Sequence, residues 1–149
     1  METESWLAYV WWSYILIVKM MIFTWYTGRL RVHRKVIHSE SDRIFVAEPG
    51  VILDPTGGGH PDIDRIRSVH RSDLEIVLPF LIITLIWLET SVPPSAVKSV
   101  LRWFTFSRIC HSLFYMEIII VHQLIKIFIS VLSYALVTYV AVSCILFYA

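Results

Sequence analysis

Two long apolar stretches near the ends of the chain restrict its fold more than any other feature. Trp6 to Tyr26 is a run of 21 residues interrupted only by Lys19, and Leu124 to Ala149 is interrupted only by Lys126. A helix of this length spans about 31 Å, which matches the hydrocarbon thickness of a bilayer. Only 17% of the residues are charged, whereas soluble domains carry roughly a quarter. The sequence therefore predicts an integral membrane protein.

Two further hydrophobic segments lie between these runs. The apolar residues Leu74 to Leu88 cover only about 22 Å as a helix, so polar residues before them must also lie at membrane depth, facing protein or water. A further segment, residues 96–116, contains Arg102 and Arg108. We therefore predict an all-α, integral membrane four-helix bundle. It forms a single domain over residues 1–149, with spans at about 6–26, 63–88, 96–116 and 124–149 and a loop at 27–62.

The distribution of positive charge predicts the orientation in the membrane. Eight Lys or Arg residues lie between Arg29 and Arg71, whereas the amino-terminal tail and the turn at 89–95 carry none. By the positive-inside rule, the loop at 27–62 is expected to be cytosolic and both termini to face the other side. The formal net charge is only +1, which gives no reason to expect a nucleic acid partner.

Two common kinds of binding site are disfavoured. Cys110 and Cys144 lie in apolar stretches without CxxC or His spacing, so we expect no metal site and no disulfide framework. The run from Pro55 to Pro61 contains three consecutive glycines, but no Lys-Ser or Lys-Thr follows them. We therefore interpret this run as a flexible turn and not as a phosphate-binding loop.

Ionisable residues concentrate in the second and third predicted spans. Arg71 and Glu75 have the i, i+4 spacing of one helical face, and Arg108, His111 and Tyr115 form a second stripe at i, i+3 and i+7. Such groups at membrane depth usually face a bundle interior or a ligand. We expect the two stripes to face each other across a polar pocket. Alternatively, Arg71 and Glu75 form a structural ion pair and Tyr115 is an ordinary interfacial aromatic.

The segment from Asp64 to Phe80 resembles the signature of the MAPEG superfamily, the membrane-associated proteins of eicosanoid and glutathione metabolism. The resemblance is to the branch of microsomal glutathione transferases and microsomal prostaglandin E synthase. It extends over roughly residues 15–130. Further matching positions follow in the same order along the chain: Lys19, Met20, Arg31, Asp42, Arg108, His111 and Tyr115.

The resemblance implies a homotrimer in the endoplasmic reticulum membrane, with the outer mitochondrial membrane as a second location. Each glutathione is expected between neighbouring protomers near the cytosolic side. Glutathione carries two carboxylates and one ammonium group, so Arg side chains suit the former and Glu75 the latter. The expected glutathione-binding residues are Arg31, Arg71, Ser72, Glu75, Arg108, His111, Tyr115 and Phe128.

Catalysis in such a protein is expected to consist of thiol activation by a nearby cation. Where the family places an Arg at the start of the fourth span, this chain offers Lys126, one or two residues later. Lys is a point charge that loses its proton more readily than Arg. Ser68 and Ser72 also replace the Arg and Asn that are usual in the family. Asp42 is a second catalytic candidate, with a helix-start cap over Ser39 to Asp42 as its alternative role.

The resulting hypothesis is a glutathione transferase, with or without peroxidase activity, that attacks lipophilic electrophiles arriving through membrane lipid. Tyr26 and Phe128 are expected to offer aromatic surface to that substrate. An isomerase of the prostaglandin E synthase type is disfavoured, because Ile127 follows Lys126 where the synthase has a hydroxyl. A third possibility is a non-catalytic member that binds a lipid or glutathione and presents it to a partner. The substitutions at Ser68, Ser72 and Lys126 favour this last alternative.

Overall fold

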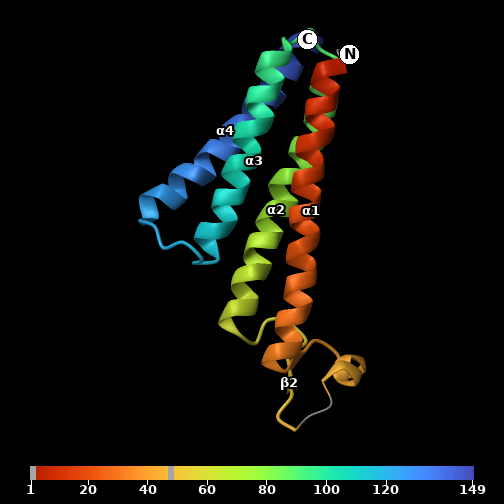
Figure 1. The fold of residues 1–149 in the computed structure, drawn as a ribbon, viewed down its shortest axis with the longest axis vertical. Helices are drawn as coiled ribbons and strands as arrows, with labels where there is room; N and C mark the ends of the chain where they lie inside the picture. Colours follow the sequence, from red (N-terminus) through yellow and green to blue (C-terminus); the bar gives the residue numbers. More distant parts are fainter. Residues whose placement is uncertain (1–2, 47–48) are drawn as a thin grey trace.

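The computed structural model describes residues 3–46 and 49–149, and residues 1–2 and 47–48 lie outside the described part. Four long helices run alternately up and down, so that both termini lie at one end (Figure 1). This confirms the predicted all-α four-helix bundle. The helices are α1 (Thr3–Arg34), α2 (Pro61–Trp87), α3 (Pro94–Tyr115) and α4 (Gln123–Tyr148).

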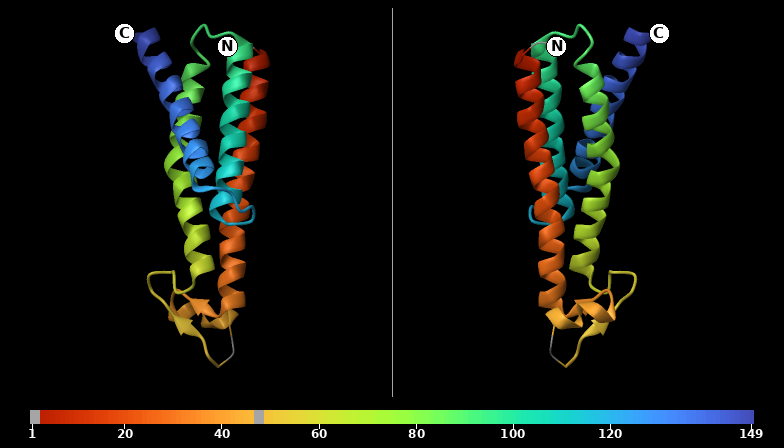
Figure 2. Two further views of the ribbon diagram at one scale, coloured as in Figure 1. Left: turned by 90° about the vertical axis from the view of Figure 1, so that its left-hand side faces the viewer. Right: turned by 90° about the vertical axis from the view of Figure 1, so that its right-hand side faces the viewer.

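Each helix packs mainly on two neighbours, with α1 beside α2 and α3, and α4 beside the same two helices. The tilt of α4 across the bundle is visible from both sides in Figure 2. The core between the helices is apolar, and Leu16, Val77, Leu101 and Val140 are fully buried within it. The rings of Phe80 and Phe104 stack with their centroids 3.5 Å apart. This core joins α2 to α3 above the polar region described below.

The first helix is longer than expected, because α1 continues to Arg34 instead of ending near Tyr26. Between these residues only Gly28 disfavours a helix, and a single glycine costs about 1 kcal/mol relative to alanine. The helix ends at Lys35, whose φ of 56° is incompatible with a further helical turn. The last two turns of α1 therefore extend beyond the expected membrane span, and Arg31 lies on a helix and not in a loop.

A small cap covers this end of α1 and α2 (Figure 1). Strand β1 (Val36–Ile37) pairs in parallel with β2 (Ile52–Leu53), and the 3₁₀ helix η1 (Glu40–Phe45) lies between them in the chain. The glycine turn then leads into α2. There His60 is the N-cap, its side chain accepting a hydrogen bond from the Asp62 N–H, and Pro61 occupies the first helical position.

Among the described residues, α1 and α4 are the two helices that are long and apolar enough to cross a membrane by length and composition. A core helix of a soluble protein is mostly buried, but only 11% of the most apolar window of α1 and 22% of that of α4 is buried. Large apolar side chains such as Trp11, Met21 and Ile145 are more than 60% exposed. These surfaces require lipid or another protein chain as their environment.

Candidate functional site

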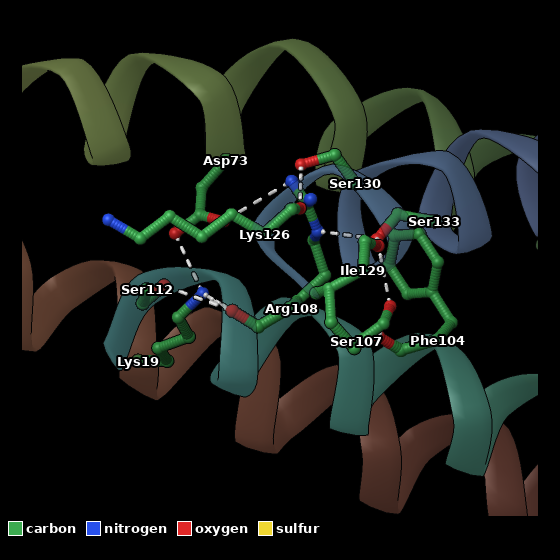
Figure 3. Close-up of polar contacts among 10 residues, drawn as sticks. All are labelled: Lys19, Asp73, Phe104, Ser107, Arg108, Ser112, Lys126, Ile129, Ser130 and Ser133. Atoms are coloured by element: carbon green, nitrogen blue, oxygen red, sulfur yellow. Dashed lines mark hydrogen bonds and ion pairs between the residues drawn. The ribbon is translucent and has the colours of Figure 1, made fainter. Parts of the chain in front are cut away.

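Three charged side chains meet inside the bundle where α1, α2 and α3 approach each other. The Lys19 ammonium lies 2.8 Å from Asp73 Oδ2, and Arg108 Nη1 lies 3.8 Å from Asp73 Oδ1. Lys19 also donates to the carbonyl oxygen of Arg108 at 2.7 Å. Asp73 and Arg108 have no exposed side-chain surface. Figure 3 shows this network, which holds two positive charges and one negative charge.

Helical periodicity explains why Asp73 is the buried carboxylate of α2. It lies four residues after Val69 and three before Ile76, and both neighbours are buried in the same stripe. Arg71 and Glu75 lie two residues away on either side, and therefore on the opposite face. Sequence analysis did not single out Asp73 as a site residue. The signal was present, since an acid interrupting an apolar i, i+3, i+4 stripe marks a buried charge that needs a cation.

The Arg108 guanidinium is only partly satisfied by its neighbours. Its Nε donates to Ser133 Oγ on α4 at 3.2 Å, and that hydroxyl in turn bonds Ser107 Oγ at 2.8 Å. Within the described part of the chain, Arg108 Nη1 and Nη2 and His111 Nδ1 are buried without a hydrogen-bond partner. Because unpaired buried donors are costly, this arrangement favours an acceptor, and above all an anion, beside Arg108.

A cavity of about 310 Å³ whose lining includes Arg108 and His111 lies between α2, α3 and α4. Most of the side chains around it are polar, although the bundle is apolar above it. Ser68 and Tyr134 are exposed, so the cavity reaches the surface of the single chain beside them. Its lining residues are Ser68, Val69, Ser72, Ile76, Arg108, His111, Tyr115, Ser130 and Tyr134. Four of the expected glutathione-binding residues, Ser72, Arg108, His111 and Tyr115, therefore share one cavity.

Tyr115 connects this cavity to Lys126. Its ring stacks on His111, with centroids 4.3 Å apart and an interplanar angle of 25°. The Lys126 ammonium lies over the ring of Tyr115, 5.7 Å from its centroid. A cation at this distance from an aromatic face is attracted by the ring. Lys126 is half-buried, and it does not itself line the cavity but contacts Tyr115, which does.

The expectation that Arg71 and Glu75 also point into this pocket is wrong for the single chain. Arg71 Nε and Glu75 Oε1 are 3.0 Å apart, but the side chains are 82% and 60% exposed. The reason is the helical period, which directs Asp73 inward and these two residues outward. The pair forms the i, i+4 contact that was considered as their structural alternative.

Arg31 and Asp42 lie apart from the cavity, under the cap at the end of α1. Arg31 Nη2 donates to the Gly57 carbonyl at 3.0 Å, which fastens the glycine turn to α1. Asp42 Oδ2 accepts the Ser39 N–H at 3.1 Å, so the helix-start cap considered for Asp42 is present. Both residues line a second cavity of about 330 Å³.

The remaining expected residue, Phe128, is 65% exposed on α4, and Tyr26 is 41% exposed on α1. Neither side chain lines the cavity beside Arg108. Among residues 3–46 and 49–149, no group of three or more His, Cys, Asp or Glu could hold a metal ion. The polar groups that converge in the bundle are hydroxyls, an imidazole, two cations and the Asp73 carboxylate.

The fold and the cavity together define a helical membrane-protein bundle with an internal polar cavity. The chain matches the MAPEG family over residues 9–146 and belongs to that family. It is 28% identical over 116 residues to human microsomal glutathione S-transferase 1, covering 78% of this chain and 74% of that protein.

Prostaglandin E synthases are also similar to this chain. The human enzyme is 24% identical over 104 residues, and the bovine enzyme (Bos taurus) is 24% identical over 109 residues. In both cases the match covers 70% of this chain and 65% of the relative. The relatives thus include two different activities at comparable identity.

Proposed function

We propose that the protein is a membrane-bound glutathione transferase that conjugates glutathione to lipophilic electrophiles. The observation that carries this proposal is the polar cavity beside Arg108, Tyr115 and Lys126 within a bundle whose surface is apolar. A charged peptide needs cations and hydroxyls, whereas its co-substrate arrives through lipid. The likeness to a glutathione transferase supports the same assignment.

In this proposal, Arg108 and its neighbours bind glutathione and Lys126 activates its thiol. Arg108 Nη2 has no hydrogen-bond partner and Nη1 has only the 3.8 Å contact with Asp73, so this guanidinium would bind a carboxylate, and Ser72 and His111 line the same space. A free thiol is only a few per cent ionised at neutral pH. Lys126, held near the ring of Tyr115, would stabilise the thiolate and so raise its reactive fraction. Asp42 is a second catalytic candidate, and its carboxylate also accepts the N–H of Ser39 at the start of η1.

A homotrimer would bring the remaining expected residues to the ligand. Arg71 and Glu75 point away from their own protomer, and charges turned towards lipid are costly. A neighbouring protomer would cover them and place them, with Arg31 and Phe128, around glutathione at the interface. The proposed location is the endoplasmic reticulum membrane, with the large loop in the cytosol and the outer mitochondrial membrane as a second site.

The proposal is tested with purified protein in detergent, by glutathione titration and by conjugation of glutathione to a chlorodinitrobenzene-type electrophile. Lys126→Ala is expected to lose turnover and to keep most of its glutathione affinity. Lys98→Ala is the matched control, because Lys98 pairs with Glu4 at the opposite end of the bundle and should leave turnover unchanged. Equal turnover in Lys126→Ala and the unmodified protein would reject Lys126 as the activating cation.

Two other outcomes identify different functions. Isomerisation of a prostaglandin endoperoxide without conjugation would assign the activity of the prostaglandin E synthases, which are 24% identical to this chain. Glutathione or lipid binding without any turnover would assign a presenting protein. Absence of glutathione binding would reject both enzymatic assignments.

A further inference from the structure

The turn between α3 and α4 has an unusual residue at the position that ends α3. The N–H of Ile118 bonds the Leu113 carbonyl at 3.1 Å, and the N–H of Glu117 bonds the Phe114 carbonyl at 3.3 Å. This is the Schellman motif, in which the residue after the C-cap takes a left-handed conformation. Here that residue is Glu117, with a φ of 57°.

Glycine is the usual residue at such a position, because a β-carbon makes the left-handed conformation unfavourable. A glutamate that replaces it gives up backbone stability and gains a side chain. The position of that side chain therefore indicates what the turn requires. Glu117 Oε2 lies 3.0 Å from Arg65 Nη2 on α2.

The Glu117–Arg65 pair is the end of a chain of ion pairs that crosses three elements. Arg65 Nη1 lies 3.9 Å from Asp62 Oδ1, and Asp62 Oδ2 lies 2.6 Å from Arg34 Nη2 on α1. The turn after α3 is thus linked electrostatically to the beginning of α2 and the end of α1. An isolated exposed pair contributes little, but a network of several charges fixes geometry better.

Side-chain packing around the turn is incomplete. A cavity of about 280 Å³ lies between the turn, α1 and α2, and its lining includes Met116 and Ile118 from the turn. Arg34, Asp62 and Arg65 line the same cavity. The Glu117–Arg65 pair therefore joins the turn to α2 beside a gap that apolar side chains leave unfilled.

We propose that Glu117 and Arg65 are positioning residues that fix the α3–α4 turn and, through it, Lys126. Tyr115 directly precedes the turn and Lys126 lies in the first turn of α4, so the turn sets the distance between the ammonium and the ring. Neither Glu117 nor Arg65 lines the cavity beside Arg108. The catalytic consequence rests on the proposed transferase function, whereas the positioning itself does not.

The test compares backbone hydrogen exchange at residues 124–126 in the unmodified protein and in four variants. Glu117→Gln and Arg65→Gln remove the charge pair, and Glu117→Gly also relieves the left-handed strain. Glu117→Arg combined with Arg65→Glu restores a pair with reversed signs. Glu40→Gln is the control, since it breaks the exposed Glu40–Arg43 pair on η1 without touching the turn.

Loss of the pair is expected to speed exchange at residues 124–126 about threefold or more, and the reversed pair to restore it. Glu117→Gly should exchange faster there while its melting temperature stays equal or rises, which separates positioning from overall stability. Unchanged exchange in both Glu117→Gln and Arg65→Gln would overturn the proposal.

A second readout addresses catalysis. The pH midpoint of thiolate formation in bound glutathione, followed by ultraviolet absorbance, should move upward in Glu117→Gln and return in the reversed pair. A midpoint that stays constant while exchange changes would overturn the catalytic part and leave the positioning part. If the unmodified protein binds no glutathione, the transferase proposal fails and the exchange experiment still decides the role of the pair.

Discussion

Arg108 Nη1 lies 3.8 Å from Asp73 Oδ1, and neither side chain has any exposed surface. Lys19 occupies the other carboxylate oxygen at 2.8 Å. One acid therefore compensates two cations in an apolar bundle, which leaves a surplus positive charge next to the cavity. A site with this charge balance favours an anionic ligand.

Asp73→Asn is expected to destabilise the protein strongly. The substitution leaves Lys19 and Arg108 without a buried carboxylate, and breaking a buried pair by removing one partner costs about 3–5 kcal/mol. Denaturant titration of helix content in mild detergent measures the loss. Glu4→Gln is the control, because Glu4 is 71% exposed beside Lys98 and an exposed pair contributes little to stability. Equal losses in the two variants would contradict the assigned role of Asp73.

Variants of Tyr115 should separate its ring from its hydroxyl. Tyr115→Phe keeps the stack on His111 and the aromatic face near Lys126, so glutathione conjugation should stay within about twofold of the unmodified rate. Tyr115→Leu removes both ring contacts and should lower the rate about tenfold. A tenfold fall in Tyr115→Phe would instead assign the hydroxyl a direct role at the thiol.

The glycine turn before α2 should be acid-sensitive. The Thr56 hydroxyl donates to Asp54 Oδ1 at 2.7 Å, and the Thr56 N–H donates to the same oxygen at 2.9 Å. Both bonds lower the pKa of the Asp54 carboxyl, and the bond from the hydroxyl has the larger effect. A lowered folded-state pKa means that the stabilisation is present above the unfolded-state pKa and is lost as pH falls through the folded value. The protection factor of the Gly57 amide, which corrects its exchange rate for the intrinsic effect of pH, should therefore fall below about pH 4.

Thr56→Val removes the hydroxyl that contributes most to this effect and keeps the size of the side chain. The Gly57 amide of this variant should exchange faster even at neutral pH, because the turn loses one of its two hydrogen bonds to Asp54 and keeps only the bond from the backbone N–H. The further loss of Gly57 protection on acidification should be smaller than in the unmodified protein, because the pKa of Asp54 is lowered less. Identical pH profiles would show that Thr56 does not hold the turn.

Apolar patterning was sufficient to predict the bundle, and the reason is physical. Runs such as Trp6 to Tyr26 can satisfy their backbone in lipid only as helices, and the prolines at 61, 93 and 94 mark where helices begin. The predicted end of α1 near Tyr26 was wrong, because the charged residues after Tyr26 suggested a loop. Polar side chains do not end a helix, and α1 continues until the left-handed Lys35.

The site was less accessible to sequence reasoning than the fold. Spacing correctly placed Arg108, His111 and Tyr115 together, because i, i+3 and i+7 define one helical face. It could not decide which face of α2 points inward, since both faces carry charge. The buried neighbours Val69 and Ile76 select the face of Asp73. The Arg71–Glu75 pair consequently lies on the exposed face of α2. Helical periodicity does not indicate what this face contacts.

Arg71 and Glu75 provide a test of whether an assembled interface completes the site. Their exposed i, i+4 pair stabilises a helix by only about 0.3–0.5 kcal/mol, so Arg71→Gln should barely change the melting temperature of the protein. If a neighbouring protomer and glutathione use these charges, glutathione affinity in the same variant should fall about tenfold, because a charged hydrogen bond to the ligand is lost. Titration calorimetry and light scattering in detergent measure affinity and assembly mass.

The reversed pair, Arg71→Glu with Glu75→Arg, keeps the contact within the helix but presents the wrong signs to the ligand. It should therefore remain as weak as Arg71→Gln, whereas full recovery of affinity would mean that the pair serves only its own helix.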